Sequence, residues 1–172
     1  LSPFWPTVDY LAENVALGSG PSRVVLSVTP PAGPGLPAGG AEILTDSSRR
    51  LFGFGSYRVR AKASPRTPTD VGVCNAFYFI NDQCEIDIEF LSDKQARSPG
   101  SGRVDIVVHD YAYLPGNRIS VHRPLPLAFD PTAAFHVFGF DWRPGRVDFY
   151  VDDALLTTVK TGDLGRINIG GN

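Results

Sequence analysis

Three acidic residues alternate with isoleucines in one short segment, and their spacing suits acid–base chemistry. They are Glu85, Asp87 and Glu89. Side chains of a β-strand point alternately to its two faces, so the three carboxyl groups would share one face. Like charges held this close repel one another, which favours an ionised carboxylate beside a protonated one. Such a pair can supply a nucleophile and a general acid to the same reaction.

The surroundings decide whether this alternation means chemistry or only a strand with one face in water. Residues 71–80 form an apolar run rich in residues that favour strands, and Asn81, Asp82 and Gln83 suit a tight turn. We therefore expect a hairpin of residues 71–80 and 85–91, with the acids inside a sheet. With a three-residue turn, Ile80 would face Cys84.

The elements that must hold this hairpin also read as strands. Eighteen glycines and fifteen prolines punctuate the 172 residues, and no long stretch repeats apolar residues at helical spacing. The class is therefore all-β. Further strands are expected at residues 24–28, 57–63, 104–109, 135–142 and 146–151, the last two joined by Arg143, Pro144 and Gly145. Residues 30–40, 64–70 and 94–103 are expected to be loops.

The acidic motif and several other stretches resemble glycoside hydrolase family 16, of endo-β-glucanases and transglycosylases. The other stretches are residues 41–43, 52–62, 135–142 and 148–153, in family order. The resemblance implies a concanavalin A-like jelly-roll sandwich of two antiparallel sheets with a concave substrate cleft. It also implies a single catalytic domain over residues 1–172. The sequence looks most like fungal secreted members.

By resemblance, the three acids carry a retaining mechanism. Glu85 would attack the anomeric carbon, and Glu89 would protonate the leaving oxygen and later activate water. Asp87 would hydrogen-bond the nucleophile. We expect Glu89 to stay protonated to higher pH than a free glutamic acid, because Glu85 and Asp87 are ionised beside it.

Five further residues are predicted to bind substrate. With the three-residue turn, Asn75, Phe77 and Phe79 would share the face of the acids, and the family places aromatic contacts at the two phenylalanine positions. A phenylalanine is otherwise usually a core residue. Arg60 matches a family arginine in the cleft. His109 matches a cleft position near the scissile sugar.

Cysteine and histidine spacing predicts neither a disulfide nor a metal site. Cys74 and Cys84 would lie about 20 Å apart along the hairpin, beyond the roughly 7 Å that a disulfide can bridge. Cys84 alternates with Glu85 and should be a small buried side chain. His109 and His136 do not combine with a nearby cysteine or aspartate, and no loop has the spacing of a calcium site. We expect no metal and no cofactor.

Charge and hydropathy narrow the partners. The net charge is −2 and the pI about 5.9, so the chain has no basic field for nucleic acid. No apolar run approaches the roughly 18 residues of a membrane span. The expected partner is a polysaccharide or oligosaccharide, and the chain is expected to be a monomer. The family resemblance implies a secreted, extracellular protein.

Three functions remain open on the sequence. The first is an endo-acting hydrolase of β-1,3/1,4-glucan in cell walls, and the second is a cell-wall transglycosylase with the same first step. The third is a non-catalytic, lectin-like carbohydrate-binding domain, which would gain nothing from three crowded acids. Where relatives continue with an Asn and Trp pair and a last strand, this chain has Gly170, Gly171 and Asn172. It is expected either to lack the C-terminal strand or strands or to build that side of the cleft differently.

Overall fold

The protein is described from a computed structural model, which covers residues 8–18, 23–45, 53–65, 72–81, 84–95, 100–114 and 117–164. The chain forms two compact units, residues 1–51 and residues 52–172. The single catalytic domain over residues 1–172 stays a prediction. The expected absence of a last strand after residue 164 concerns residues outside the described ranges.

The first unit contains two small sheets. β1 (Val8–Tyr10) pairs in parallel with β4 (Ala38–Gly40), and β2 (Val15–Leu17) pairs antiparallel with β3 (Val24–Leu26). Asn14 ends a single turn of 3-10 helix and is buried. Its side-chain amide donates to the carbonyl of Gly40 at 3.2 Å, and its backbone carbonyl accepts from Ser27 at 2.9 Å. Asn14 thus bonds to a strand of one sheet through its side chain and to the residue after a strand of the other through its backbone.

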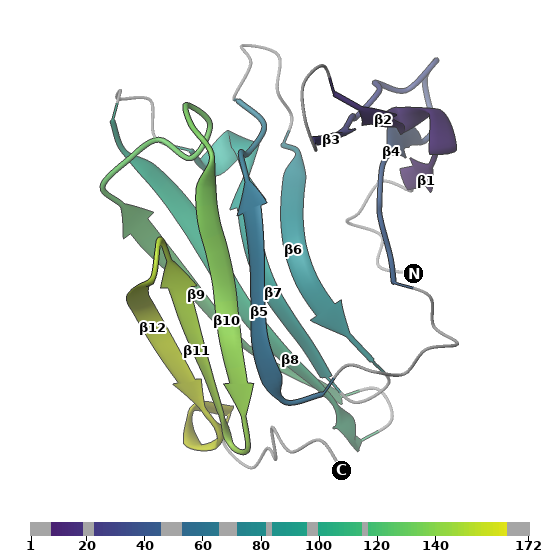
Figure 1. Ribbon diagram of the computed structural model, residues 1–172. Helices are drawn as coiled ribbons and strands as arrows, with labels where there is room; N and C mark the ends of the chain where they lie inside the picture. The colour runs from purple at the N-terminus through teal and green to yellow at the C-terminus, as the bar shows by residue number, and fades with distance from the viewer. Residues whose placement is uncertain are drawn as a thin grey trace. The chain divides into compact units, whose positions relative to one another are not determined.

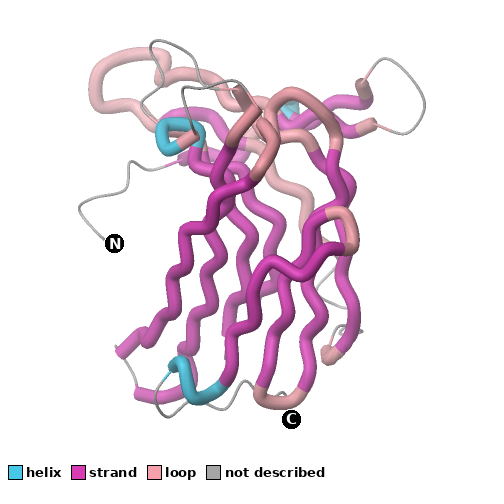
Figure 2. The backbone as a smooth tube through the Cα atoms, turned by 90° about the vertical axis from the view of Figure 1, so that its left-hand side faces the viewer, coloured by secondary structure: helices cyan, strands magenta, loops and turns pink. Residues whose placement is uncertain are grey.

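The described residues of the second unit form two antiparallel sheets of four strands each (Figure 1). We call the first the acidic sheet; in spatial order it contains β6 (Cys74–Ile80), β7 (Cys84–Leu91), β8 (Gly102–Leu114) and β9 (Asn117–Leu127). The opposing sheet contains β12 (Ala154–Lys160), β11 (Arg146–Val151), β10 (His136–Arg143) and β5 (Gly55–Ala61). Figure 2 shows how strands dominate the backbone, with helix confined to short segments such as η2 (Ser92–Lys94) and η3 (Thr161–Leu164).

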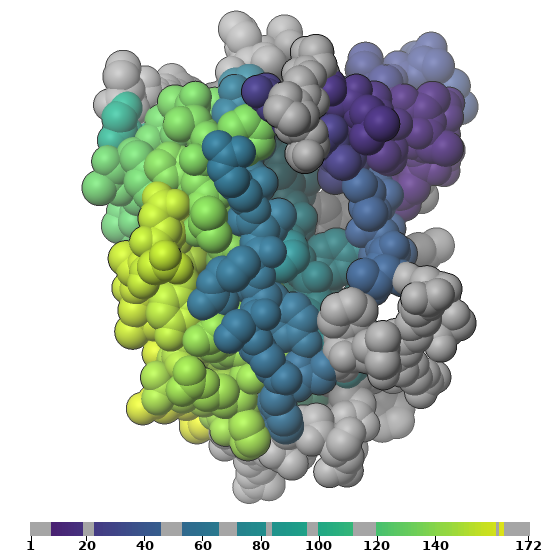
Figure 3. All heavy atoms as spheres, in the orientation of Figure 1, coloured from purple at the N-terminus to yellow at the C-terminus, as the bar shows by residue number. Residues whose placement is uncertain are grey.

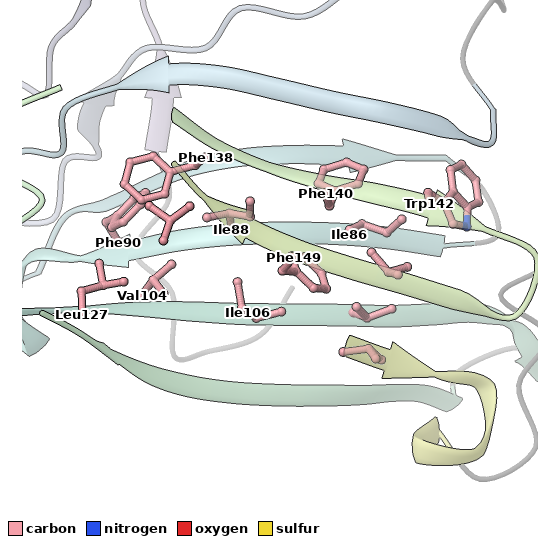
Figure 4. Packing of buried hydrophobic residues seen from close by; sticks show 14 of the residues in the cluster. Ile86, Ile88, Phe90, Val104, Ile106, Leu127, Phe138, Phe140, Trp142 and Phe149 are labelled. Atoms are coloured by element: carbon pink, nitrogen blue, oxygen red, sulfur yellow. The ribbon is translucent and has the colours of Figure 1, made fainter. Parts of the chain in front are cut away.

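The core lies between the two sheets (Figure 4). Ile86 and Ile88 of β7 are at most 1% exposed, as are Phe138 and Phe140 of β10. Burial of each such side chain contributes about 1.5–3 kcal/mol. Because the apolar residues of β7 alternate with its acids, packing this apolar face fixes the acids on the other one. The predicted all-β sandwich of two antiparallel sheets is confirmed.

The strand β9 was not predicted, because Pro124 and Pro126 interrupt its sequence. Proline lacks a backbone N–H and is therefore excluded from central strands but accepted at sheet edges. β9 is the last strand of the acidic sheet, next to β8 alone. The two prolines lie opposite Asp105 and Arg103 in the register.

The β11–β12 hairpin turns through two residues with left-handed backbone, Asp152 at φ 46° and Asp153 at φ 64°. A two-residue turn of this type favours Asn-Gly, since glycine adopts positive φ without steric cost. We expect Asp153→Gly to stabilise the chain by about 0.5–1 kcal/mol, measured by urea unfolding. The matched control is Gly145→Ala, at φ 70° in the β10–β11 turn, which should destabilise it by about 1 kcal/mol. Equal midpoints for Asp153→Gly and wild type would contradict the prediction.

Candidate active site

The register between β6 and β7 decides which side chains accompany the acids. Ile80 lies opposite Glu85, and Phe77 lies opposite Ile88. The backbone N–H of Asn81 donates to the carbonyl of Cys84 at 2.9 Å, so two residues separate this bonded pair, one fewer than the three predicted for the turn. That predicted turn is therefore wrong. A shift of one residue moves every side chain of a strand to its other face.

The shift places Phe77 and Phe79 on the core face. The ring of Phe77 packs against Phe140 with centroids 5.8 Å apart, and that of Phe79 packs against Trp142 at 4.9 Å. The prediction that they share the face of the acids is wrong. They bury apolar area between the sheets, as phenylalanine usually does.

Asn75 also leaves the predicted face. It lies opposite Phe90, and its side-chain oxygen accepts a hydrogen bond from the backbone N–H of Ser64 at 2.6 Å. Its predicted place beside the acids is wrong for the same reason of register. The residues of β6 that share the outward face with the acids are Cys74, Ala76, Tyr78 and Ile80.

Arg60 lies on the opposing sheet, whose outward side includes β5 and β10 in Figure 3. Its neighbours Val59 and Ala61 pack against the core, so Arg60 points away from it. The guanidinium stacks over the Phe135 ring at 4.6 Å, a cation–π contact. Arg60 therefore lies away from the acids, because the two sheets turn their outward faces in opposite directions, and its predicted contact with the substrate stays a prediction.

Glu85, Asp87 and His109 come together on the acidic sheet. His109 lies directly opposite Glu85 on β8. Its Nε2 lies 3.5 Å from Asp87 Oδ2 and 3.9 Å from Glu85 Oε2, and its Nδ1 lies 2.6 Å from the Ser120 hydroxyl. The structure thus brings His109 beside two of the acids, and its predicted contact with the substrate stays a prediction.

Glu85 also accepts a hydrogen bond from the Tyr111 hydroxyl. The Tyr111 ring stacks with His109, with centroids 6.0 Å apart. The Glu85 side chain is 20% exposed and that of Asp87 is 5% exposed. A donor aimed at a carboxylate favours its ionised form, so this environment suits an anion that stays partly accessible. Sequence reasoning missed Tyr111, because the predicted strand ended two residues before it.

Glu89 lies in a different environment. Burial raises the pKa of its carboxyl group, and the charge of Asp105 adds to the rise. The Cys74 thiol donates to Glu89 Oε1 at 3.8 Å. The expected direction for Glu89 is confirmed, but the main causes are burial and Asp105 rather than Glu85 and Asp87.

The cysteines lie at opposite ends of the β6–β7 pair. Cys74 lies opposite Leu91, Cys84 lies opposite Asp110 on β8, and both are free. Burial raises the pKa of the Cys74 thiol to about 12 and that of Cys84 to about 11. Neither thiol is therefore a ready nucleophile at neutral pH. Cys84 packs against the core as predicted.

Oxygen and nitrogen atoms of Glu85, Asp87 and His109 lie within 4.8 Å of one another, which is close enough for a cation or for shared protons. Acidic groups commonly approach this closely without an ion. We interpret the closeness as that of a proton-sharing site, and the absence of a metal stays a prediction.

This arrangement can be compared with known proteins. The sequence model described as glycosyl hydrolases family 16 matches residues 21–168, which include all three acids. The chain belongs to glycosyl hydrolases family 16. The three alternating acids of β7 are the motif on which the resemblance to this family was based.

The chain is also similar to two curated proteins that have different names. A β-glucanase of Acetivibrio thermocellus is 34% identical over 111 residues, which is 61% of this chain and 29% of the relative. Xyloglucan endotransglucosylase/hydrolase protein 2 of Arabidopsis thaliana is 31% identical over 116 residues, 66% of this chain and 36% of the relative. The chain spans about a third of these relatives. They are bacterial and plant proteins, so the predicted closeness to fungal members is not supported.

A similar solved structure confirms the fold. It is a prokaryotic β-1,3-1,4-glucanase (lichenase) from a mouse hindgut metagenome, with a TM-score of 0.66 and 26% identity. The match covers 88% of this chain and 64% of that one. The jelly-roll prediction is therefore confirmed. Among the described residues, no helix is long and apolar enough to cross a membrane.

Proposed function

We propose that this chain is a retaining, endo-acting glycoside hydrolase that cleaves β-1,3/1,4-glucan. The observation that carries the proposal is the contrast between two glutamates on the outward face of β7. Glu85 accepts a hydrogen bond from Tyr111, whereas burial raises the pKa of Glu89. One is suited to remain an anion and the other to hold a proton, which is the division of roles that glycoside cleavage needs. The names of the relatives support glucan as the substrate.

In the first step, Glu85 attacks the anomeric carbon and the bond from that carbon to the leaving oxygen breaks. The proton of Glu89 passes to the leaving oxygen, so that a neutral sugar departs. The product is a glycosyl-enzyme ester on Glu85. The two glutamates are four positions apart, about 13 Å along a strand. Their long side chains must lean together to the roughly 5–5.5 Å between carboxyl groups that retention requires.

In the second step, Glu89 is a carboxylate and removes a proton from water. The water oxygen attacks the anomeric carbon, and the carbon–oxygen bond to Glu85 breaks. Two inversions give net retention of the β configuration. The chemistry requires no cofactor.

Asp87 and His109 support Glu85 in this proposal. Asp87 is almost fully buried between the two glutamates, and His109 Nε2 is within 4 Å of both Asp87 and Glu85. Because interacting groups titrate together, the three share protons as a unit. His109 is held by Ser120 and limits the rotation of Glu85.

We also propose that the protein acts outside the cell as a monomer. A polymeric glucan is an extracellular substrate, which supports secretion.

A transglycosylase is the second candidate. It shares the first step, and the glycosyl-enzyme then reacts with a sugar hydroxyl in place of water. The relative from Arabidopsis carries both activities in its name. A lectin-like domain is less favoured, because binding a neutral sugar gains nothing from a protonated glutamate beside an anionic one.

Product analysis distinguishes these functions. Barley mixed-linkage glucan is incubated with the protein, with and without added oligosaccharide acceptors, and products are followed by mass spectrometry and by NMR of the new anomeric centres. We expect shorter products with the β configuration, present before any α form appears. Products longer than the substrate would assign the transglycosylase. Binding without new products would contradict both enzyme assignments.

A further inference from the structure

A second buried acid faces Glu89 from the neighbouring strand. Asp105 of β8 lies directly opposite Glu89, so the two side chains share the outward face of the acidic sheet. Side chains in such pairs have Cβ atoms about 4.5–5.5 Å apart. The Asp105 side chain is 0% exposed, and like charges directly opposite are destabilising. An aspartate at this position is therefore unfavourable unless other groups compensate its charge.

Arg103 and His122 hold Asp105. The guanidinium of Arg103 donates to the Asp105 carboxylate from Nε at 2.8 Å and from Nη2 at 2.5 Å. Bidentate hydrogen bonds between two charged groups are among the strong ones. His122 Nε2 lies 2.6 Å from Asp105 Oδ1. Burial acts to raise the pKa of Asp105, but these hydrogen bonds outweigh it and keep the pKa below its usual value. Asp105 is thus a fixed anion beside a glutamate that must keep its proton.

We propose that Asp105, held by Arg103 and His122, is a positioning residue that keeps the proton of Glu89 in place for transfer to the leaving group. This inference rests on the proposed role of Glu89 as the general acid. A buried anion across the strand pair disfavours the second negative charge that ionised Glu89 would add. The hydrogen bonds from Arg103 and His122 keep Asp105 from taking that proton itself.

Other charged and titratable groups also face Glu89. They come from all four strands of the acidic sheet and are Cys74, Glu85, Asp87, Arg103 and His122. After burial, Asp105 is the largest influence on the pKa of Glu89, while the charge of His122 lowers it and that of Glu85 raises it less. Removing Asp105 should therefore change Glu89 more than removing any other single charge on this face.

The chain contains a matched control. Arg103-Val104-Asp105 is repeated as Arg146-Val147-Asp148 on β11. Asp148 is 1% exposed, accepts hydrogen bonds from Arg146 Nε at 2.7 and 2.8 Å and from the Thr158 hydroxyl at 2.5 Å, and lies on the opposing sheet. Asp148→Asn removes a buried, clamped carboxylate of the same kind without touching the face of the acids.

The test is the titration of Glu89, followed by carbon NMR of protein labelled in its glutamate carboxyl groups, with Glu89→Gln assigning the resonance. In Asp105→Asn, the midpoint of Glu89 should fall by about one pH unit, as expected for loss of one neighbouring like charge. In Asp148→Asn it should not move, although both variants should lose thermal stability to a similar degree. If Asp105→Asn folds poorly, His122→Gln provides the opposite sign, because His122 acts to lower the pKa of Glu89 and its removal should raise the midpoint.

Activity gives the second readout. The alkaline limb of kcat/KM on mixed-linkage glucan should move to lower pH in Asp105→Asn, by the same amount as the NMR midpoint. An unmoved Glu89 midpoint in Asp105→Asn would overturn this inference, whatever the activity. Absence of glucan cleavage by wild type would instead count against the proposed function, and the NMR titration would still decide the role of Asp105.

Discussion

Replacing Glu85 with glutamine should lower kcat/KM on mixed-linkage glucan by about 10⁴-fold or more. Glutamine has nearly the shape of glutamate and can still accept the hydrogen bond from Tyr111, so the fold should survive. The amide cannot form the ester with the anomeric carbon, and no glycosyl-enzyme can accumulate. Release of reducing ends over hours at high protein concentration gives the rate, and intact-mass spectrometry after rapid quenching tests for the ester.

The control for Glu85→Gln is Glu13→Gln, which removes an exposed glutamate of the first unit and should leave the rate unchanged. Binding of glucan by Glu85→Gln should persist, because the neutral sugar does not depend on the charge. A variant that kept more than a tenth of the wild-type rate would move the nucleophile to another acid, of which Asp87 is the nearest on the strand. That result would also weaken the proposed retaining mechanism.

The alternation in β7 predicted the face of the acids correctly, because one face of this strand is apolar and the other is acidic. Ile86 and Ile88 must be buried, and the core can accept them from one side only. Slipping this strand by one residue would bury Glu85 and Glu89 instead, at several kcal/mol for each unpaired charge. The face of the acids was therefore predictable from the sequence alone.

The face of β6 was not predictable in the same way. Its residues 76–80 are apolar or aromatic on both faces, so periodicity does not choose between them. The prediction then depended on the length of the turn, and an error of one residue put Phe77 and Phe79 on the wrong side. Their packing against Phe140 and Trp142 of a distant strand decides the register, and a tertiary contact of this kind is invisible in a local pattern.

The same limit explains what was missed around Glu89. Asp105 is sixteen residues away in sequence and His122 thirty-three, and only strand pairing brings them to the same face. The alternation of Asp105, Val107 and His109 was a usable signal, since it resembles that of the acidic segment. Pairing β8 antiparallel with β7 would have placed all three beside the acids.

Replacing Glu89 with glutamine should slow glucan cleavage by about 10²–10⁴-fold, the usual contribution of general acid–base catalysis. The sign of the pH effect follows from the raised pKa of Glu89. In wild type, activity should fall as pH rises through that pKa, because the leaving oxygen loses its proton donor. In Glu89→Gln this alkaline limb should disappear, since no proton is there to lose. The measurement is kcat/KM on glucan across about pH 4–9, a range that begins near the pKa of an ordinary glutamate and extends above it.

The leaving group provides the sharper test of Glu89. An aryl glucoside with a dinitrophenolate leaving group departs without a proton, so Glu89→Gln should form the glycosyl-enzyme from it at nearly the wild-type rate. The ester should then accumulate, because water attacks slowly without a base. Added azide needs no base, and its attack on the anomeric carbon should release Glu85 and give the β-glycosyl azide. Loss of activity on the aryl substrate to the same extent as on glucan, with no azide product, would show that Glu89 supports the site without transferring the proton.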